Sequence, residues 1–492
     1  MQHPGEGNSV AIVGGGLAGL AAAAALARFA AERNPERNLE RKPAWKIELF
    51  ESRRTLGGRA GSFLDPETGQ LLDHCQHVGM GCCTNFADFC RQTGVDSLLR
   101  RDRVLHFFGP DGRRYDLSAA RWLPAPGHLG PSLMRLGYLT LSQRLGVARA
   151  LLRLARLRIS EEAPQPTFGQ WLREQRQAPA AVDRFWSIVI VSALSEDVDA
   201  VALSVARKVF VDGFMAHRQA YEIAVPTRSL GELYGEHVAG WLREHGVTLH
   251  LGRSAARLMH AGDSITGVVD GQGIESPCEA VIVACPWRRV AELVPDGLRE
   301  RLPELQALEQ FSPAPITALH LWFDRPITEL PHAVLIDRLS QWVFSHGKSE
   351  PPRASTDELA ESWYYQVVVS ASRQLAGRPR EDVLAEVRRD LAAVWPESEA
   401  ARLLHWRMVT QHEAVFSPRP ETERQRPAQQ SSLDNLYWAG DWTRTGWPAT
   451  MEGAVRSGYL AAEALLAKYG QRPRIVVPDL PRNWLTRRLC GG

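Results

Sequence analysis

Near the start of the chain, three glycines have the spacing of a turn that binds the phosphates of a dinucleotide. A β-branched run, Val10–Val13, leads into Gly14, Gly16 and Gly19 in the pattern G-x-G-x-x-G, and an alanine-rich stretch follows. The first glycine allows a tight turn, the second lets the backbone approach a pyrophosphate, and the third lets a helix pack closely on the sheet. The helix N-terminus supplies the positive potential, so no lysine is needed. We assign the residues of this turn to the site: Gly14, Gly16, Leu17, Ala18 and Gly19.

Two strands and a helix must position the turn. The helix is expected over Leu20–Phe29, and the second strand, Lys46–Glu51, ends in an acidic residue. A doubly wound fold places the carboxylate that accepts hydrogen bonds from a ribose at this point. Glu51, with the adjacent Ser52, is therefore predicted to bind the cofactor; the alternative is an ordinary solvated strand end. Residues 32–44 are polar, contain two prolines and are interpreted as a surface insertion.

The segment after Glu51 carries a family resemblance. Arg53–Ser62 contains the sequence Gly57-Gly58-Arg59, and with the first motif it resembles flavoproteins of the amine oxidase and phytoene desaturase superfamily. The resemblance implies FAD as the cofactor and assigns Gly57, Gly58 and Arg59 to its diphosphate. An arginine adds a charge-assisted contact, for which two glycines leave room.

A second motif near the other end of the chain resembles the closing FAD motif of the same superfamily. It comprises Leu436–Trp442 and Gly446–Ala454. The resemblance implies a strand that delivers a Gly-Asp pair to the cofactor, followed by a helix that begins near Thr450 and points its N–H groups at the flavin. It assigns six residues to the cofactor: Gly440, Asp441, Pro448, Ala449, Thr450 and Met451. Trp447-Pro448 can also serve as a rigid turn before the helix.

Strands in the middle of the chain complete the predicted cofactor domain. Alternating or β-branched runs occur at Gly246–Gly252, Ser264–Val269 and Glu279–Pro286, and the family pattern places Ala255 or Ala256 against the adenine. The expected fold class is α/β: a discontinuous Rossmann-type FAD-binding domain with an inserted α+β substrate domain. We expect residues 1–80, 220–290 and 425–470 in the FAD domain, 81–219 and 291–424 in the substrate domain, and 471–492 as a basic C-terminal tail.

Composition indicates a large globular protein. The 492 residues are 44% hydrophobic and 23% charged, with a formal net charge of +2, so no strong field for nucleic acid is expected. The first residues lack a secretory signal and no apolar run is long enough to span a bilayer, which predicts a cytoplasmic protein. Four of the seven cysteines, Cys75, Cys82, Cys83 and Cys90, lack C-x-x-C spacing. They are expected to be buried thiols, and no metal site is predicted.

Two basic segments suggest contact with a membrane. Ser132–Arg158 has leucines at helical spacing, several arginines and no acids, as expected for a helix on an anionic bilayer. The alternative is a helix packed on the substrate domain with its arginines in solvent. The tail Arg472–Arg488 is a weaker candidate. Together with a lipid substrate, these segments favour a peripheral location on the inner face of the cytoplasmic membrane.

Three further stretches indicate the substrate: Asp73–Asn85, Arg184–Leu194 and Ala206–Phe214. They resemble hydroxysqualene dehydroxylases, FAD enzymes of bacterial squalene and hopanoid synthesis. The resemblance implies removal of the allylic hydroxyl of hydroxysqualene, a long-chain isoprenoid, to give squalene, with an unidentified reductant for the flavin. His74 and Cys75 depart from this family, in which an amide and a glycine are more common, and this leaves open a shifted substrate.

The implied reaction needs an acid, because hydroxide is a poor leaving group. His74 and His77 are the predicted catalytic residues, since histidine titrates near neutrality; both can instead be structural donors. Glu196, Asp197 and Tyr221 are reserves. Phe185, Trp186 and Phe214 are predicted to line a substrate tunnel, although aromatic side chains in apolar runs are often ordinary core.

Two other activities fit the same cofactor motifs. An oxidative carotenoid-type desaturase would move hydride toward the flavin and need an electron acceptor. A small-amine oxidase would surround the flavin with aromatic side chains, for which Trp442 and Trp447 are candidates. A scaffold role without catalysis is disfavoured, because no protein-interaction repeat is recognised.

Overall fold

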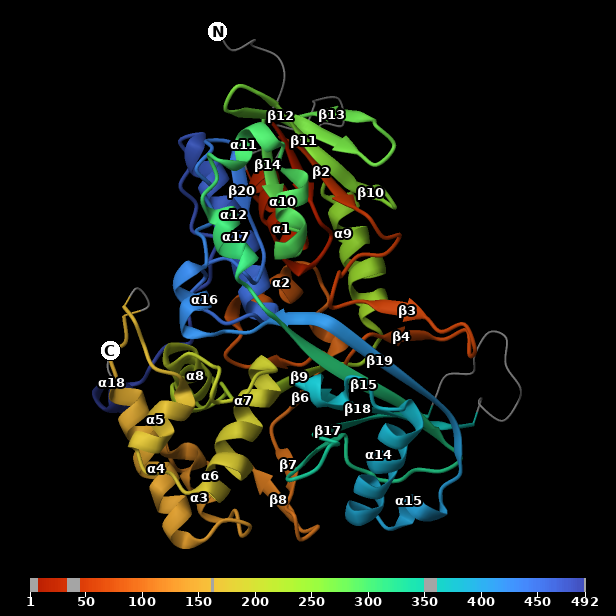
Figure 1. The fold of residues 1–492 in the computed structure, drawn as a ribbon, viewed down its shortest axis with the longest axis vertical. Helices are drawn as coiled ribbons and strands as arrows, with labels where there is room; N and C mark the ends of the chain where they lie inside the picture. The colour runs from red at the N-terminus through yellow and green to blue at the C-terminus, as the bar shows by residue number, and fades with distance from the viewer. Residues whose placement is uncertain (1–7, 33–44, 161–162, 349–360, 491–492) are drawn as a thin grey trace.

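The structure is a computed structural model that describes residues 8–32, 45–160, 163–348 and 361–490. A five-stranded parallel sheet forms its upper part in Figure 1. The strand order is β10-β2-β1-β14-β20, as expected for a Rossmann-type fold. These strands are β1 (Asn8–Val13), β2 (Trp45–Glu51), β10 (Val247–Leu251), β14 (Ala280–Val283) and β20 (Leu436–Trp438). Of the insertion predicted at 32–44, Glu32 is the last residue of α1 (Leu17–Glu32), and residues 33–44 lie outside the described residues.

Both faces of this sheet are covered. Val10 and Ile12 of β1 pack with α1 (Leu17–Glu32), α9 (Ala239–Glu244) and α17 (Met451–Lys468). Ala11 and Val13 face the other side, in a core with α10 (Trp287–Leu293) and the antiparallel sheet β11-β12-β13. The period-2 alternation of a strand explains why adjacent residues serve different cores. The three antiparallel strands are Ala255–Ala261, Ser264–Asp270 and Glu275–Pro277.

A seven-stranded sheet and a group of helices form the lower part of the molecule (Figure 1). Its order is β19-β15-β18-β17-β16-β7-β8. The long strands β15 (Pro313–Phe323) and β19 (Leu403–Phe416) run from the parallel-sheet region into it, and α14 (Arg380–Val394) packs on one face. The other strands are β18 (Trp363–Ser370), β17 (Trp342–Lys348), β16 (His332–Leu335), β7 (Leu105–Phe108) and β8 (Arg114–Leu117).

The helices beside this sheet share one apolar core. They are α3 (Gly130–Met134), α4 (Leu141–Arg156), α5 (Phe168–Glu174), α6 (Pro179–Ala181), α7 (Ser187–Leu194) and α8 (Leu203–Phe210). Wide π-helical turns, η3 (Val182–Trp186) and η4 (Val211–Met215), flank α7 and α8.

The prediction of one continuous helix over 132–158 is wrong. The chain turns after α3, and Thr140 begins α4 with a capping box, in which its hydroxyl accepts from the Gln143 N–H and the Gln143 side chain accepts from the Thr140 N–H. Val147, Ala150 and Leu154 of α4 face the core. Much of the apolar face seen in the sequence is therefore used for packing.

The remaining helices and strands are short. They are β3 (Ser62–Leu64), β4 (Leu71–Asp73), β5 (Gly79–Met80), α2 (Thr84–Gln92), η1 (Asp96–Leu98), β6 (Leu99–Asp102), η2 (Gly127–Leu129), β9 (Ile223–Pro226), η5 (Gly231–Val238), α11 (Asp296–Arg299), α12 (Glu304–Glu309), η6 (Ser372–Leu375), α15 (Glu397–Ala400), α16 (Pro420–Gln425) and α18 (Trp484–Cys490). Among the described residues, no helix is both long enough and apolar enough to cross a bilayer.

Candidate functional site: two adjoining cavities

A cavity of about 530 Å³ opens at the carboxyl ends of the parallel strands, where this fold class binds its ligands. Gly14 follows β1 with φ +115°, and a Cβ there would lie 2.7 Å from the carbonyl oxygen of Ala284. A Cβ on Gly19 would collide with the Gly14 carbonyl. Gly14 therefore permits the turn, and Gly19 permits the close approach of α1, as the motif predicts.

The Gly57-Gly58 segment forms the opposite wall of the phosphate end. The Gly57 N–H donates to the Gly15 carbonyl at 2.9 Å, and a Cβ on Gly58 would lie 3.1 Å from the Cα of Gly16. Two backbones thus lie side by side with no side chain between them. This leaves a narrow cradle of main-chain groups, which suits a diphosphate.

Glu51 is fixed at the end of β2. Its carboxylate accepts from the N–H groups of Gly15 (2.7 Å) and Arg53 (2.8 Å) and from the Ser52 hydroxyl (3.1 Å). Both Glu51 and Ser52 line the cavity. The carboxylate is therefore held in one orientation, with lone pairs available to ribose hydroxyls.

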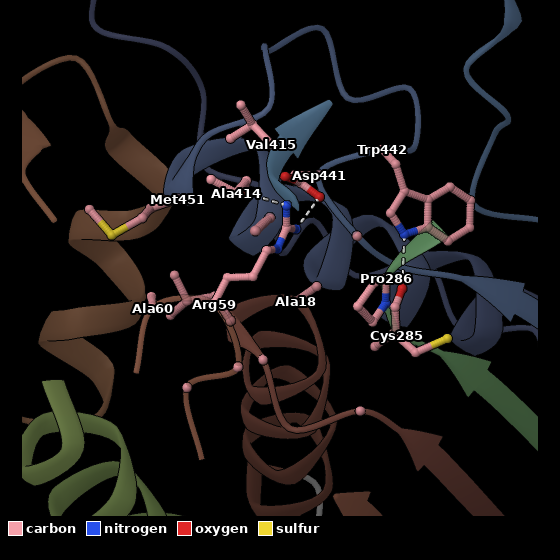
Figure 2. Close-up of a pocket in the computed structure, with 18 of the residues that line it drawn as sticks. Ala18, Arg59, Ala60, Cys285, Pro286, Ala414, Val415, Asp441, Trp442 and Met451 are labelled. Carbon is pink, nitrogen blue, oxygen red and sulfur yellow. Dashed lines mark hydrogen bonds and ion pairs between the residues drawn. The ribbon is translucent and has the colours of Figure 1, made fainter. Parts of the chain in front are cut away.

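Arg59 and Asp441, which both line the cavity, lie in contact in Figure 2. Arg59 Nη2 donates to Asp441 Oδ1 at 2.5 Å, and Nη1 donates to the Ala414 carbonyl at 2.9 Å. They are 382 positions apart in sequence. The pairing brings the two predicted FAD motifs together.

At the far end of the cavity, α17 begins as predicted. Thr450 caps the helix by accepting from the Gly453 N–H at 3.2 Å. Most predicted cofactor residues line this first cavity, which is called the cofactor cavity below. They are Gly14, Gly16, Leu17, Ala18, Glu51, Ser52, Gly57, Gly58, Arg59, Ala255, Gly440, Asp441, Ala449, Thr450 and Met451. Gly19 lies behind the turn. Pro448 lines the neighbouring cavity instead.

A third wall of this cavity carries no recognisable signal in the sequence. Gln411, Ala414 and Val415 of β19 line the cavity, as do Arg289 and Gln76. In sequence β19 is only an amphipathic strand, without a motif. These residues reach the cavity only because β19 runs past the carboxyl ends of the parallel strands in the folded protein.

A second cavity, of about 460 Å³, adjoins the first and is lined mainly by aliphatic and aromatic side chains. Its volume lies within the roughly 300–1,000 Å³ of typical ligand sites. The seven-stranded sheet contributes Phe107, Trp342, Phe344 and Val368, and the helical region lies opposite. Both cavities share the same wall residues: Cys75, Gln76, Val78, Ala193, Ile316, Thr450 and Met451.

All three stretches that suggested the substrate contribute to this apolar cavity, the first of them through Cys75, Gln76, Val78, Met80, Cys82 and Cys83. Phe185 and Val189 come from η3 and α7, and Phe210 and Phe214 come from α8 and η4. Trp186 does not join them: it is 0% exposed, packs against Phe168 and Phe210, and donates its indole N–H to Gln177 at 3.0 Å. The structure therefore places Trp186 in the core, although Phe185 and Phe214 line the cavity.

His77 and His74 have different surroundings. His77 lines the cofactor cavity, and its Nδ1 lies 2.9 Å from the Cys75 carbonyl oxygen. Burial lowers the pKa of His77, and the nearby Arg59 lowers it further, although the Cys75 carbonyl opposes this shift. His74 lines neither cavity and stacks on Phe63. Burial, with Arg53 and His77 nearby, lowers its pKa to about 4.

The reserve candidates have structural partners. Glu196 forms a bidentate ion pair with Arg373 at 2.7 and 2.8 Å. The Tyr221 hydroxyl donates to the Arg103 carbonyl and accepts from the Ala119 N–H. Asp197 accepts from the Asp199 N–H. These three residues line neither cavity.

The cysteines predicted to be buried thiols are free. Cys75, Cys82 and Cys90 are buried and Cys83 is half-buried. Burial raises the pKa of Cys75 to about 12, which keeps that thiol protonated. No group of acidic, histidine and cysteine side chains suited to a metal ion occurs in the part of the chain that the structure describes.

Comparison with known proteins gives the class. The model of the flavin containing amine oxidoreductase family matches residues 17–466, so the chain belongs to this family. It is a flavin-containing oxidoreductase, and FAD is its cofactor. The cradle between Gly16 and Gly58 and the fixed carboxylate of Glu51 fit that group.

More specific similarities point in two directions. The chain is 24% identical over 481 residues to hydroxysqualene dehydroxylase of Rhodopseudomonas palustris, covering 93% of this chain and 98% of that one. It is 25% identical over 494 residues to 15-cis-phytoene desaturase of Synechococcus elongatus, covering 94% and 97%.

Solved structures share the fold. An oxidoreductase from Methanosarcina mazei has a TM-score of 0.66 at 16% identity, covering 93% of this chain and all of its own. Putrescine oxidase bound to putrescine has a TM-score of 0.65 at 15% identity, covering 94% of this chain and 100% of its own. These likenesses concern architecture alone.

Proposed function

We propose that this protein is a reductive dehydroxylase of a long isoprenoid alcohol, with hydroxysqualene as substrate and squalene as product. The observation that carries the proposal is the apolar cavity joined to the cofactor cavity through a shared wall. A C30 hydrocarbon chain needs such an apolar lining. The stretches that resemble hydroxysqualene dehydroxylases contribute Phe185, Val189, Phe210 and Phe214 to it.

The chain's own residues prepare the reaction. Bound FAD supplies two-electron chemistry, as a hydride donor when reduced. Gly14, Gly16–Ala18, Gly57–Arg59 and Asp441 would hold its diphosphate region, and Glu51 would hold a ribose. The apolar wall around Phe214 excludes water, which protects an allylic cation formed as the C–O bond breaks.

His77 is the proposed proton donor, because it lines the cofactor cavity and His74 does not. A carbonyl oxygen can only accept, so His77 Nδ1 carries a proton toward Cys75, and Nε2 of the neutral ring has none to give. His77 must therefore act as the imidazolium. Since burial lowers its pKa below the ordinary 6.5, turnover should be fastest in mildly acidic buffer and fall as pH rises.

The test of the reaction is a single turnover without oxygen. Purified protein is photoreduced, incubated with hydroxysqualene and analysed by mass spectrometry. Squalene formation coupled to flavin oxidation is expected. His77→Ala should retain FAD and lose squalene formation, whereas the matched control His74→Ala should keep it; an active His77→Ala variant would remove this residue from the mechanism.

Oxidative desaturation is the second candidate, because an apolar cavity also fits a carotene and one relative is a phytoene desaturase. The same preparation, oxidised and given phytoene with a quinone, would then produce a conjugated polyene visible by absorbance. If this product forms and squalene does not, the dehydroxylase proposal fails.

Amine oxidation is less well supported by the geometry. Trp442 lines the cofactor cavity and Trp447 the apolar one. Their indole N–H groups donate to the Cys285 carbonyl and to Asp479. The two rings therefore do not form one cage. Formation of hydrogen peroxide when the protein is incubated with small amines in air would support this alternative.

We also propose peripheral contact with the inner face of the cytoplasmic membrane. Leu141, Leu145 and Leu152 of α4 are exposed beside exposed arginines, and Trp122 and Trp484 are 76% and 68% exposed. Such a mixture suits an anionic lipid surface. Co-sedimentation with anionic vesicles should fall in Leu145→Glu and remain in the distant surface variant Glu275→Gln.

A further inference from the structure

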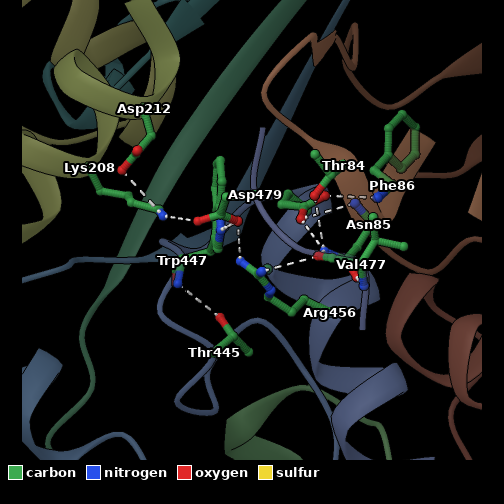
Figure 3. Close-up of polar contacts among 12 residues, drawn as sticks. Thr84, Asn85, Phe86, Lys208, Asp212, Thr445, Trp447, Arg456, Val477 and Asp479 are labelled. Atoms are coloured by element: carbon green, nitrogen blue, oxygen red, sulfur yellow. Dashed lines mark hydrogen bonds and ion pairs between the residues drawn. The ribbon is translucent and has the colours of Figure 1, made fainter. Parts of the chain in front are cut away.

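The C-terminal segment after α17 contains an acidic side chain held by both halves of the protein. Asp479 Oδ2 lies 2.7 Å from Lys208 Nζ of α8, and Oδ1 lies 2.9 Å from Arg456 Nη1 of α17. Figure 3 shows the two cations reaching Asp479 from opposite sides. The predicted basic tail thus docks on the molecule through an acid.

Asp479 also holds an aromatic side chain. The Trp447 indole N–H donates to Asp479 Oδ1 at 3.1 Å. Lys208 Nζ lies 4.5 Å from the centroid of the Trp447 ring, and Arg456 Cζ lies 5.8 Å from it, within the range of cation–π attraction. One carboxylate therefore fixes two cations and the indole that they contact.

This indole begins the wall between the two cavities. Trp447 and Pro448 line the apolar cavity, Ala449 lines the cofactor cavity, and Thr450 and Met451 line both. Thr445 and Arg426 hold the Trp447 backbone. The contact with Asp479 fixes its side chain.

The rest of the tail has separate anchors. Asn85 exchanges two hydrogen bonds with the backbone of Val477, at 2.8 and 3.0 Å. Arg482 pairs with Asp212 at 2.9 Å. Loss of the Asp479 side chain should therefore change the wall without releasing the segment.

We propose that Asp479 is a positioning residue for the wall between the flavin and the substrate. Acting through the Trp447 indole, it holds the segment 447–451 in place, and through Lys208 and Arg456 it ties that wall to both parts of the molecule. The inference rests on the FAD site, and on the proposed substrate only where turnover is measured.

The test uses the full-length holoenzyme and needs no substrate. Asp479→Ala should raise the Kd for FAD about tenfold, because the wall segment 447–451 loses the order that the Asp479–Trp447 hydrogen bond provides, and should shift the absorbance bands of the bound flavin. Asp479→Asn keeps an acceptor for the indole and should lie closer to wild type. The control Arg482→Gln breaks another contact of the tail and should leave FAD binding and the spectrum unchanged.

A double-mutant cycle tests whether Asp479 acts on FAD binding through the Trp447 indole. Trp447→Phe keeps an aromatic ring, although a smaller one, and removes the N–H, so it should weaken FAD binding as Asp479→Ala does. The double variant should be no worse than either single one. Additive losses, or an Asp479→Ala spectrum and Kd equal to wild type, would overturn the proposal.

A turnover measurement adds a second criterion. If the proposed reaction holds, Asp479→Ala should raise KM for the isoprenoid more than it lowers kcat. If no isoprenoid is turned over by the wild type, the proposed function fails, and the FAD measurements still decide the role of Asp479.

Discussion

Apart from their shared wall, the two cavities are built from different parts of the polypeptide. The cofactor cavity has a wall of backbone at Gly14–Gly16 and Gly57–Gly58, with a few fixed polar side chains such as Glu51 and Arg59. The apolar cavity is lined by side chains from a sheet and from helices with π-helical turns. The first is specified by local spacing, and the second by tertiary packing.

The difference has a chemical basis. A diphosphate is recognised by N–H groups that every residue carries, so the sequence need only permit the right turn. A hydrocarbon is recognised by shape, which depends on how side chains from distant segments meet. Substitutions in the cofactor cavity should therefore weaken binding by changing the backbone conformation. Substitutions in the apolar cavity should weaken binding by changing the volume of the side chains that line it.

The largest effect on FAD binding is expected at Gly19. In Gly19→Ala, the new Cβ would collide with the Gly14 carbonyl, which should abolish FAD retention and lower stability by roughly 1–3 kcal/mol. Gly240→Ala in α9 is the control: a Cβ there meets nothing within 4 Å. It should bind FAD normally and gain about 0.5 kcal/mol. Flavin content and thermal unfolding measure both variants; normal flavin content in Gly19→Ala would contradict the backbone argument.

The second comparison separates cavity lining from core. Trp186→Ala removes a fully buried ring and its bond to Gln177, so the free energy of unfolding should fall by about 3–5 kcal/mol. Phe214→Ala widens an existing cavity and should cost roughly 1–2 kcal/mol while raising KM. Denaturant unfolding and steady-state kinetics distinguish them. Equal destabilisation would show that Phe214 serves as core.

The third prediction concerns the charge in the cofactor cavity. Arg59→Met removes hydrogen bonds near the predicted diphosphate site and should weaken FAD binding by about 10–100-fold, from a loss of roughly 1.5–3 kcal/mol. Arg173 also pairs with an acid, Asp199, but on the exposed surface. Arg173→Met should leave FAD affinity unchanged. Titration of the apoprotein with FAD gives both constants, and equal affinities for wild type and Arg59→Met would refute the assignment.

The smallest predicted effect is at Asp73, beside the shared wall. Burial raises its pKa to about 6, although the Ser62 hydroxyl and the Leu230 N–H bind its Oδ1. The folded state therefore keeps this proton up to about pH 6, whereas the unfolded state loses it near pH 3.8. As the pH rises from about 4 to 6, this difference progressively lowers the free energy of unfolding. Asp73→Asn keeps the acceptor and removes the charge, and should gain on the order of 1 kcal/mol above pH 6. Unfolding curves at pH 4.5 and 7.5 test this; a gain equal at both pH values would exclude the charge as its cause.

Much of the cofactor site could be predicted because its residues follow strand ends in fixed order. Gly14, Gly16, Leu17, Ala18, Glu51 and Gly57–Arg59 all line the cavity. Gln411, Ala414 and Val415 could not be predicted, because a strand without a motif reveals nothing of the ligand that it passes. The sequence does not distinguish the adjacent aromatic residues Phe185 and Trp186, whereas η3 directs only Phe185 to the cavity.

The sequence by itself determined the nucleotide-binding turn, the acidic strand end and the two remote FAD motifs, because each depends on local backbone geometry. Only the tertiary structure decided which side chains bound the apolar cavity, that His77 reaches the cofactor cavity and His74 does not, and that the tail docks through Asp479. These outcomes depend on contacts between segments hundreds of residues apart, for which spacing along the chain carries no information.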